Sequence, residues 1–135
     1  MPTNVLLFKL SKVETQYCSF CNTERETLIH LFCQCNITKS FWKELRLWLL
    51  PKQMELSIQP HSIILGQNCN TPNKTLEFVN LTAKYYIYCC KIQNTIPLLI
   101  VFLEKLNYIK EVEKYISLER STYSKHVRKW KILEA

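Results

Sequence analysis

The stretch CSFCNTERETLIHLFCQC, residues 18 to 35, decides the fold of this chain. It holds two pairs of potential metal ligands: Cys18 and Cys21 with two residues between them, and His30 and Cys35 with four between them. Thiolate and imidazole are ligands that Zn²⁺ prefers, and four of them close a tetrahedral site that is structural rather than catalytic. The spacing therefore predicts one structural zinc ion bound by these four side chains.

The residues between the ligands predict a tight turn followed by a helix. The two residues between the first cysteines suit such a turn. Thr23 followed by Glu26 is typical of a capping box, which opens a helix. This helix would hold His30 in its third turn and end near Cys35, so that the turn and the helix end each supply two ligands.

Two alternatives compete with this ligand set. Free cysteine is often buried as a small apolar residue, and His30 would then be a hydrogen-bonded histidine at the edge of the helix. Cys33 can also take the place of Cys35, because it lies three residues after His30 and therefore on the same helix face. The residue types and spacings alone leave both alternatives open.

The same stretch resembles the zinc-binding segment near the carboxy terminus of LINE-type (non-LTR) retrotransposon reverse transcriptases. The residues that carry the resemblance are Cys18, Cys21, Glu26-Thr27, His30-Leu31-Phe32, Cys35 and Phe41-Trp42. Three later segments resemble the tail of such proteins: Ile64-Leu65-Gly66, residues 83–88 and Lys129-Trp130. In that family the position of Cys33 holds a non-ligand residue, which favours Cys35 as the fourth ligand. Only the cysteine and histidine block is specific, although the resemblance covers most of the chain.

The resemblance implies an accessory nucleic-acid-binding role beside a reverse transcriptase. Such a segment would grip template RNA or target DNA during target-primed reverse transcription, with the polymerase region as a partner in a longer chain. In the family a polymerase precedes this block, whereas here only 17 residues do. We therefore expect a fragment or a truncated open reading frame, and a decayed element without function is a further alternative.

Composition limits the class of protein. The chain has 135 residues, of which 47% are hydrophobic, and a single glycine argues against a turn-rich all-β fold. Seven cysteines without a secretory signal predict reduced thiols and an intracellular protein, in the cytoplasm, the nucleus or both. The apolar run at residues 97–103 is too short to span a bilayer, so no membrane partner is expected.

Hydrophobic periodicity predicts an all-α domain of about five helices. Beyond the first, near His30, we expect helices at residues 37–50, 75–93, 97–116 and 122–133. Residues 1–17 are a strand or a segment that packs on the turn between the cysteines. The predicted organisation is a zinc-binding module at residues 1–50, a connector at 51–74 and a helical tail at 75–135, which can pack as one domain.

Positive charge favours a polyanionic partner, RNA or DNA, because the net charge is +7. Two patches are candidates for nucleic-acid binding. The first, on one flank of the helix at 75–93, consists of Lys84, Tyr88 and Lys91; the second, on the last helix, consists of Lys125, Arg128 and Lys129. The second lies opposite an apolar face of Tyr123, Val127 and Trp130. The alternatives are lysines that extend along a helix edge and a charged face that only meets water.

No catalytic constellation is visible in the sequence. The chain contains no aspartate, and therefore no aspartate cluster for polymerase metals, and it lacks a glycine-rich phosphate loop. We expect a chain that is not an enzyme by itself. The predicted function is that of a nucleic-acid-binding accessory segment, and the alternative is a zinc-stapled helical protein-interaction module. Salt separates the two, because nucleic-acid affinity falls steeply as salt is added.

Overall fold

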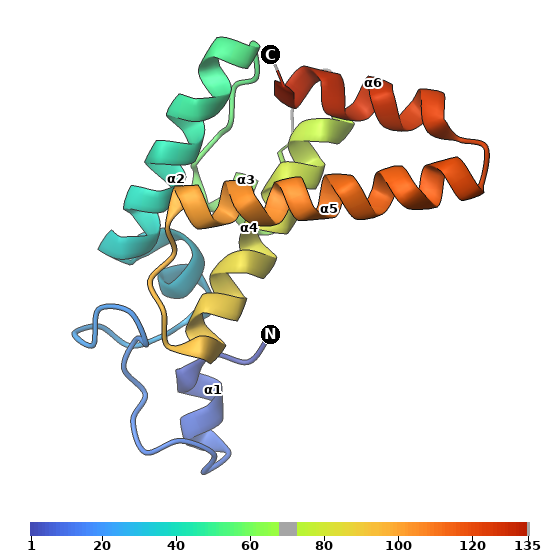
Figure 1. The fold of residues 1–135 in the computed structure, drawn as a ribbon. Helices are drawn as coiled ribbons and strands as arrows, with labels where there is room; N and C mark the ends of the chain where they lie inside the picture. Colours follow the sequence, from blue (N-terminus) through green and yellow to red (C-terminus); the bar gives the residue numbers. More distant parts are fainter. Residues whose placement is uncertain (68–72, 135) are drawn as a thin grey trace.

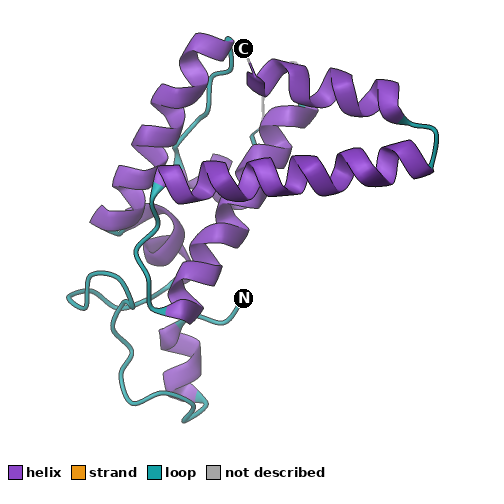
Figure 2. Cartoon of the chain, in the orientation of Figure 1, coloured by secondary structure: helices purple, strands orange, loops and turns teal. Residues whose placement is uncertain are grey.

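The computed structural model describes residues 1–67 and 73–134, and within these ranges the secondary structure is helical (Figure 2). An isolated bridge between Tyr17 and Arg25 is the only β-type pairing of the described residues. The predicted all-α class is therefore confirmed. The helices are α1 (Asn4–Lys9), α2 (Asn36–Leu49), α3 (Pro60–Leu65), α4 (Lys74–Gln93), α5 (Leu99–Glu119) and α6 (Tyr123–Glu134), with a π-helical turn η1 (His30–Gln34) and a 3-10 turn η2 (Leu50–Lys52).

Helix α4 runs through the middle of the molecule, and α5 crosses it (Figure 1). Helix α2 lies on one side and contacts α5 and η1. Helices α5 and α6 form an antiparallel hairpin that extends away from the end of the molecule that carries residues 18–35 (Figure 1). Of the described helices, none combines the length and the apolar composition that a bilayer crossing requires.

The core is built around an aromatic cluster where α2, α4 and α5 meet. The ring of Phe41 lies 5.7 Å from Trp42, 5.7 Å from Tyr86 and 5.5 Å from Phe102, measured between ring centroids. The pairs with Trp42 and Phe102 are edge-on, and the pair with Tyr86 is tilted; such contacts add to the free energy of apolar burial. The indole of Trp42 also donates a hydrogen bond to the carbonyl of Phe32 in η1 at 2.7 Å. Phe41 and Trp42, in the helix expected at residues 37–50, are therefore part of the core.

Of the two expectations for residues 1–17, the strand is wrong, because the segment begins with the short helix α1. It does pack on the turn between the cysteines, since the side chain of Asn4 donates to the hydroxyl of Ser19 at 3.2 Å. The backbone amide of Leu7 donates to the carbonyl of Thr3 and that of Lys12 to the carbonyl of Leu7, so the segment satisfies its own backbone groups. Asn4 is buried and ties the segment to the body, since its amide donates to the Glu26 carboxylate at 2.8 Å.

The predicted connector at 51–74 packs on the core over much of its described length. Met54, Leu56 and Ile63 are buried, and Ile63 belongs to helix α3. Gln67 fastens the segment, because its side chain accepts from the amide of Ser57 at 2.8 Å and donates to the carbonyl of the same residue at 2.9 Å. Residues 68–72 of the connector lie outside the described residues. The buried core cluster includes residues on both sides of the connector.

The apolar stripe predicted along α5 is buried only in its first half. Phe102 and Leu106 are buried, whereas Val112 and Ile116 are 40% and 44% exposed. The helix predicted from this periodicity is present, but its second half extends beyond α4 in the hairpin (Figure 1). A helical stripe shows which residues share a face, and it does not show whether a neighbour covers that face.

The buried face of α6 is also different from the predicted one. Trp130 is buried as expected, but its companions are His126 and Leu133, while Tyr123 and Val127 are exposed. Trp130 fixes this rotation. Its ring packs edge-on against Phe78 of α4 at 5.6 Å, and its indole N–H donates to Glu113 of α5 at 3.0 Å.

Candidate metal centre and basic surfaces

The four predicted ligands meet at one point of the structure. The donor atoms of Cys18, Cys21, His30 and Cys35 all lie within 4.8 Å of one another. The Sγ atoms of Cys18 and Cys35 are 3.9 Å apart, and Sγ of Cys21 lies 3.4 Å from Nε2 of His30. Tetrahedral bonds of about 2.3 Å to sulfur and about 2.0 Å to nitrogen require separations of about 3.8 Å and 3.5 Å. The cluster can therefore hold a metal ion.

The turn between the first two cysteines is closed by its own backbone. The amide of Asn22 donates to the carbonyl of Cys18 at 3.0 Å, and Asn22 adopts a left-handed conformation with φ of 57°. Asparagine tolerates this conformation better than most residues. The amide of Phe20 points at Sγ of Cys18, at 3.4 Å. Amides directed at sulfur stabilise a thiolate, as metal binding requires.

The helix after the turn begins at Thr27, and the predicted capping box at Thr23 and Glu26 is wrong. The hydroxyl of Thr27 accepts from the amide of His30 at 3.1 Å, and its carbonyl accepts from the amide of Leu31 at 3.0 Å. Thr27 is therefore the N-cap, and His30 lies in the first turn rather than the third. The Glu26 carboxylate is buried and accepts instead from the backbone amides of Asn4 and Ser19, so it does not cap this helix.

Replacing Thr27 with alanine is expected to lower the free energy of unfolding by about 1 kcal/mol, because the amide of His30 would lose its side-chain partner. Urea unfolding of the metal-loaded protein measures the change. Thr95→Ala is the control, since Thr95 is exposed and its side chain caps no helix. Equal effects of the two substitutions would contradict the assignment of the cap.

A π-helical turn brings Cys35 back toward His30. The amide of Cys35 donates to the carbonyl of His30 at 2.8 Å, five residues earlier, and Cys35 is extended with ψ of 132°. In an α-helix the fifth residue would lie about 140° further round the axis than its start, whereas the wider turn reduces this angle. The carbonyl of Cys35 then accepts from the amide of Lys39, and this hydrogen bond opens the first turn of α2.

Cys33 is not part of the cluster. It is buried two residues before Cys35, and burial raises the pKa of its thiol to about 11, with nearby Lys84 acting in the opposite direction. The Sγ atom of Cys33 is absent from the group of donor atoms that lie within 4.8 Å of one another. Of the two alternatives for the fourth ligand, the structure therefore brings only Cys35 to the other three donors.

Hydrogen bonding favours the thiolate at two of the clustered cysteines. The thiol of Cys18 donates a hydrogen bond to Cys35, which lowers the pKa of Cys35 to about 5 and raises the pKa of Cys18. Burial of Cys35 raises its pKa, whereas hydrogen bonds from backbone amides at the start of α2 lower it. At Cys21 burial again opposes ionisation. Hydrogen bonds from the Thr23 side chain and neighbouring groups outweigh it and lower the pKa to about 7. The cluster is therefore prepared to bind a cation.

A buried ion pair connects the metal centre to α4. Nζ of Lys91 lies 2.8 Å from Oε1 of Glu26, and the two side chains are 5% and 0% exposed. The amide of Ser19, inside the cysteine turn, donates to the other carboxylate oxygen at 2.7 Å. Lys91 also donates to the side chain of Asn4 at 2.8 Å. This network could not be predicted from local sequence patterns, because its partners lie far apart in the chain.

This network corrects the prediction of a free cationic flank on α4. Lys91 cannot reach a phosphate without breaking its pair with Glu26. Tyr88 donates to the carbonyl of Pro2 at 3.0 Å, and Lys84 donates to the carbonyl of Ile64 at 3.2 Å. Lys91 is therefore buried in an internal contact, whereas Lys84 and Tyr88 are half-buried, and nucleic-acid binding by them stays a prediction.

The second predicted patch is divided by the structure. Lys125 and Arg128 are exposed on α6. Lys129 instead lies 2.9 Å from Glu113 and 3.7 Å from the centroid of the Phe78 ring, so it belongs to the contact between α6 and the body. Lys125 and Arg128 are therefore the exposed cations of this patch, whereas the side chain of Lys129 is 32% exposed and paired.

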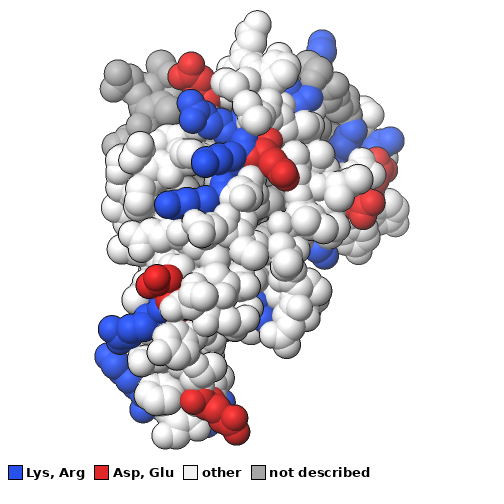
Figure 3. All heavy atoms as spheres, turned by 90° about the vertical axis from the view of Figure 1, so that its left-hand side faces the viewer, with Lys and Arg blue, Asp and Glu red and all other residues white. Residues whose placement is uncertain are grey.

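A basic row on α2 was missed in the sequence. Lys39, Lys43 and Arg46 are exposed at spacings of four and three residues, which places them on one face of the helix. Figure 3 shows a row of Lys and Arg side chains on the side of the molecule that carries α2. The same spacing rule applied to residues 37–50 would have found this row.

Comparison of the chain with protein-family models, with curated proteins and with solved structures finds no match.

Proposed function

We propose that the cluster of Cys18, Cys21, His30 and Cys35 binds one Zn²⁺ ion in a structural role. Three thiolates and one imidazole form a soft donor set, which suits zinc, whereas magnesium and calcium prefer oxygen ligands. Four protein donors leave no open position for a substrate or a reactive water. The measured separations of the donor atoms support this proposal.

We further propose that the chain is a non-catalytic, intracellular nucleic-acid-binding segment of a retrotransposon-type reverse transcriptase, with the polymerase region supplied by a longer chain. The observation that carries this proposal is the closed Cys3His cluster, whose residues are the ones on which the resemblance to that family rests. The exposed basic residues of α2 and α6 give it a physical basis, because lysine and arginine bind phosphates regardless of sequence.

Neutralising Lys125 and Arg128 together by substitution with glutamine is expected to weaken binding to all single-stranded sequences alike. The slope of log affinity against log salt should fall by about 1.4, because each phosphate contact on a single strand contributes about 0.7. Titration of labelled single-stranded RNA, single-stranded DNA and duplex at several salt concentrations measures both effects. The unmodified protein should bind at least one of these ligands at low salt.

The matched control is the double variant Lys9→Gln and Lys12→Gln, which removes the same charge from exposed positions at the α1 end of the molecule. It should leave the salt slope nearly unchanged. Equal losses in the two double variants would show that only net charge matters. If the unmodified protein binds none of the three ligands at low salt, the proposed function is wrong.

A second candidate function, a zinc-stapled protein-interaction module, is favoured by one observation. Helix α5 exposes large apolar side chains from its middle onward, among them Tyr108 at 71% and Tyr115 at 68%. Exposed apolar residues of this size support association with another protein. Binding through them would change little with salt, which distinguishes this function from the first.

A further inference from the structure

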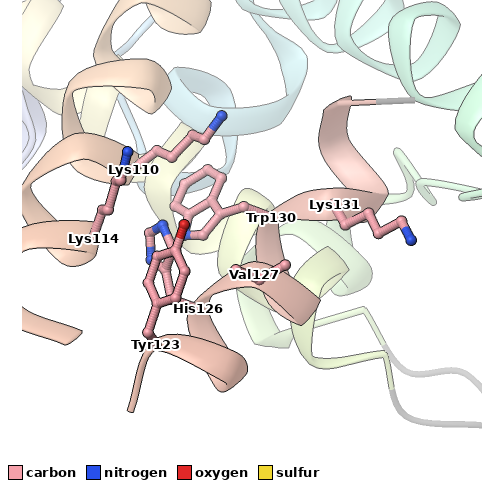
Figure 4. Close-up of a pocket in the computed structure, with 7 residues that line it drawn as sticks. All are labelled: Lys110, Lys114, Tyr123, His126, Val127, Trp130 and Lys131. Carbon is pink, nitrogen blue, oxygen red and sulfur yellow. The ribbon is translucent and has the colours of Figure 1, made fainter. Parts of the chain in front are cut away.

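A cleft of about 390 Å³ lies between α5 and α6 (Figure 4). The hairpin of these two helices extends away from the end of the molecule that carries residues 18–35 (Figure 1). This volume is within the range of pockets that bind small ligands. Its lining combines cations with aromatic rings: Lys110, Lys114, Lys131, Tyr123, His126 and Trp130. None of these residues belongs to the patches predicted from the sequence.

His126 gives the cleft a buried polar atom that the fold leaves unused. The side chain is 9% exposed, and its Nδ1 atom has no hydrogen-bond partner among the described residues. Buried nitrogen atoms are nearly always paired, because an unmade hydrogen bond costs free energy. The ring is held in place by Tyr123, which stacks on it at 6.0 Å and 17°, and by Trp130 at 6.3 Å. His126 lines the cleft, and a ligand there that reached the buried Nδ1 atom would remove this cost.

The lysines that line the cleft favour an anionic ligand. Lys114 extends from α5 on the side of Tyr123 and His126, whereas the end of Lys110 passes Trp130 and Lys131 points away on the far side of that ring (Figure 4). The lining includes no acidic residue within the described part of the chain. Lysine ammonium groups beside a histidine are suited to a phosphate oxygen.

The aromatic residues of the cleft favour a ligand that carries a planar group beside its anionic group. Tyr123 is 42% exposed although it is stacked on His126, so part of its ring is open to a ligand. Bases of single-stranded nucleic acid stack on such rings while nearby cations bind the backbone. A phosphate alone would leave the ring of Tyr123 unused.

We propose that the cleft between α5 and α6 binds one nucleotide unit of single-stranded nucleic acid, with the phosphate near Lys114 and His126 and the base against Tyr123. This inference rests on the proposed function, and it adds the part of the surface that distinguishes a single strand from a duplex. In a duplex the base is stacked between its neighbours and cannot reach the ring.

The test uses the full metal-loaded chain and three probes: a labelled ten-nucleotide single-stranded RNA, adenosine monophosphate and inorganic phosphate. Tyr123→Leu should weaken binding of the RNA by roughly 5- to 150-fold, which corresponds to the loss of one stacked base. Lys114→Gln should lower the salt slope by about 0.7. The imidazole nuclear magnetic resonance signals of His126 should shift on addition of the mononucleotide.

The matched controls are Tyr115→Leu and Lys105→Gln, two exposed residues of α5 outside the cleft. They should leave RNA binding unchanged. If the RNA binds but Tyr123→Leu and Tyr115→Leu behave alike, the cleft is not the site, and the proposed function still stands. If RNA does not bind but the mononucleotide shifts His126 and Tyr123→Leu prevents this, the cleft stands and the proposed function fails.

Two further outcomes would overturn the inference. Inorganic phosphate that binds as tightly as the mononucleotide, with no effect of Tyr123→Leu, would make the cleft a phosphate site without base recognition. Duplex that binds as tightly as the single strand, with the same loss in Tyr123→Leu, would show that no base enters the cleft. Failure of all three probes to bind would overturn the inference and the proposed function together.

Discussion

Replacing Cys35 with serine is expected to abolish stoichiometric metal binding, whereas Cys33→Ser should leave it intact. Structural zinc in small domains contributes on the order of 10 to 16 kcal/mol of apparent binding free energy, so the loss of one thiolate from four has a large effect. Cys35 lies 3.9 Å from Cys18 within the donor cluster, and Cys33 lies outside it. Native mass spectrometry of protein purified with zinc measures the number of ions per chain.

The two cysteines form a matched pair, because both are buried and only one residue separates them. The unmodified chain should carry one ion. The opposite result, with the ion lost from Cys33→Ser and kept by Cys35→Ser, would show that the fourth ligand is wrong. A mass equal to that of the metal-free chain for the unmodified protein would rule out the site altogether.

Replacing Lys91 with methionine is expected to lower the free energy of unfolding by about 3 to 5 kcal/mol. Methionine keeps the length and the helix propensity of the side chain but removes its charge. The Glu26 carboxylate would then be a buried anion without its cation, although the amides of Asn4 and Ser19 would still donate to it. Urea unfolding at a fixed excess of zinc measures the loss.

Two variants test whether the pair itself is responsible. Lys125→Met removes an exposed lysine from a helix and should change the free energy of unfolding by no more than about 0.5 kcal/mol. The double variant Glu26→Gln and Lys91→Met should lose less than Lys91→Met alone, because no unpaired charge remains. A change below about 1 kcal/mol for Lys91→Met would contradict the role given to this pair.

Local patterns in the sequence predicted the elements that depend on neighbouring residues. The four donors were found by spacing, since a turn and a short helix fix where their side chains can go. Helices α2, α4, α5 and α6 were found by periodicity, because apolar residues at spacings of three and four lie on one helix face. Even here the start of the first helical turn differs from the prediction. Thr23 and Thr27 both suit an N-cap, and only the burial of the Glu26 side chain distinguishes them.

The sequence by itself therefore determined the helical class and the set of donors, whereas tertiary structure decided which faces are buried and which charges are free. Lys91 looks like a surface cation until Glu26 is brought against it, and Trp130 sets the rotation of α6 only when Phe78 and Glu113 are in place. The cleft that contains His126 likewise exists only because α6 folds back on α5. The physical reason is that periodicity depends on bonds within a helix, whereas burial and ion pairing depend on residues that the fold brings together from distant parts of the chain.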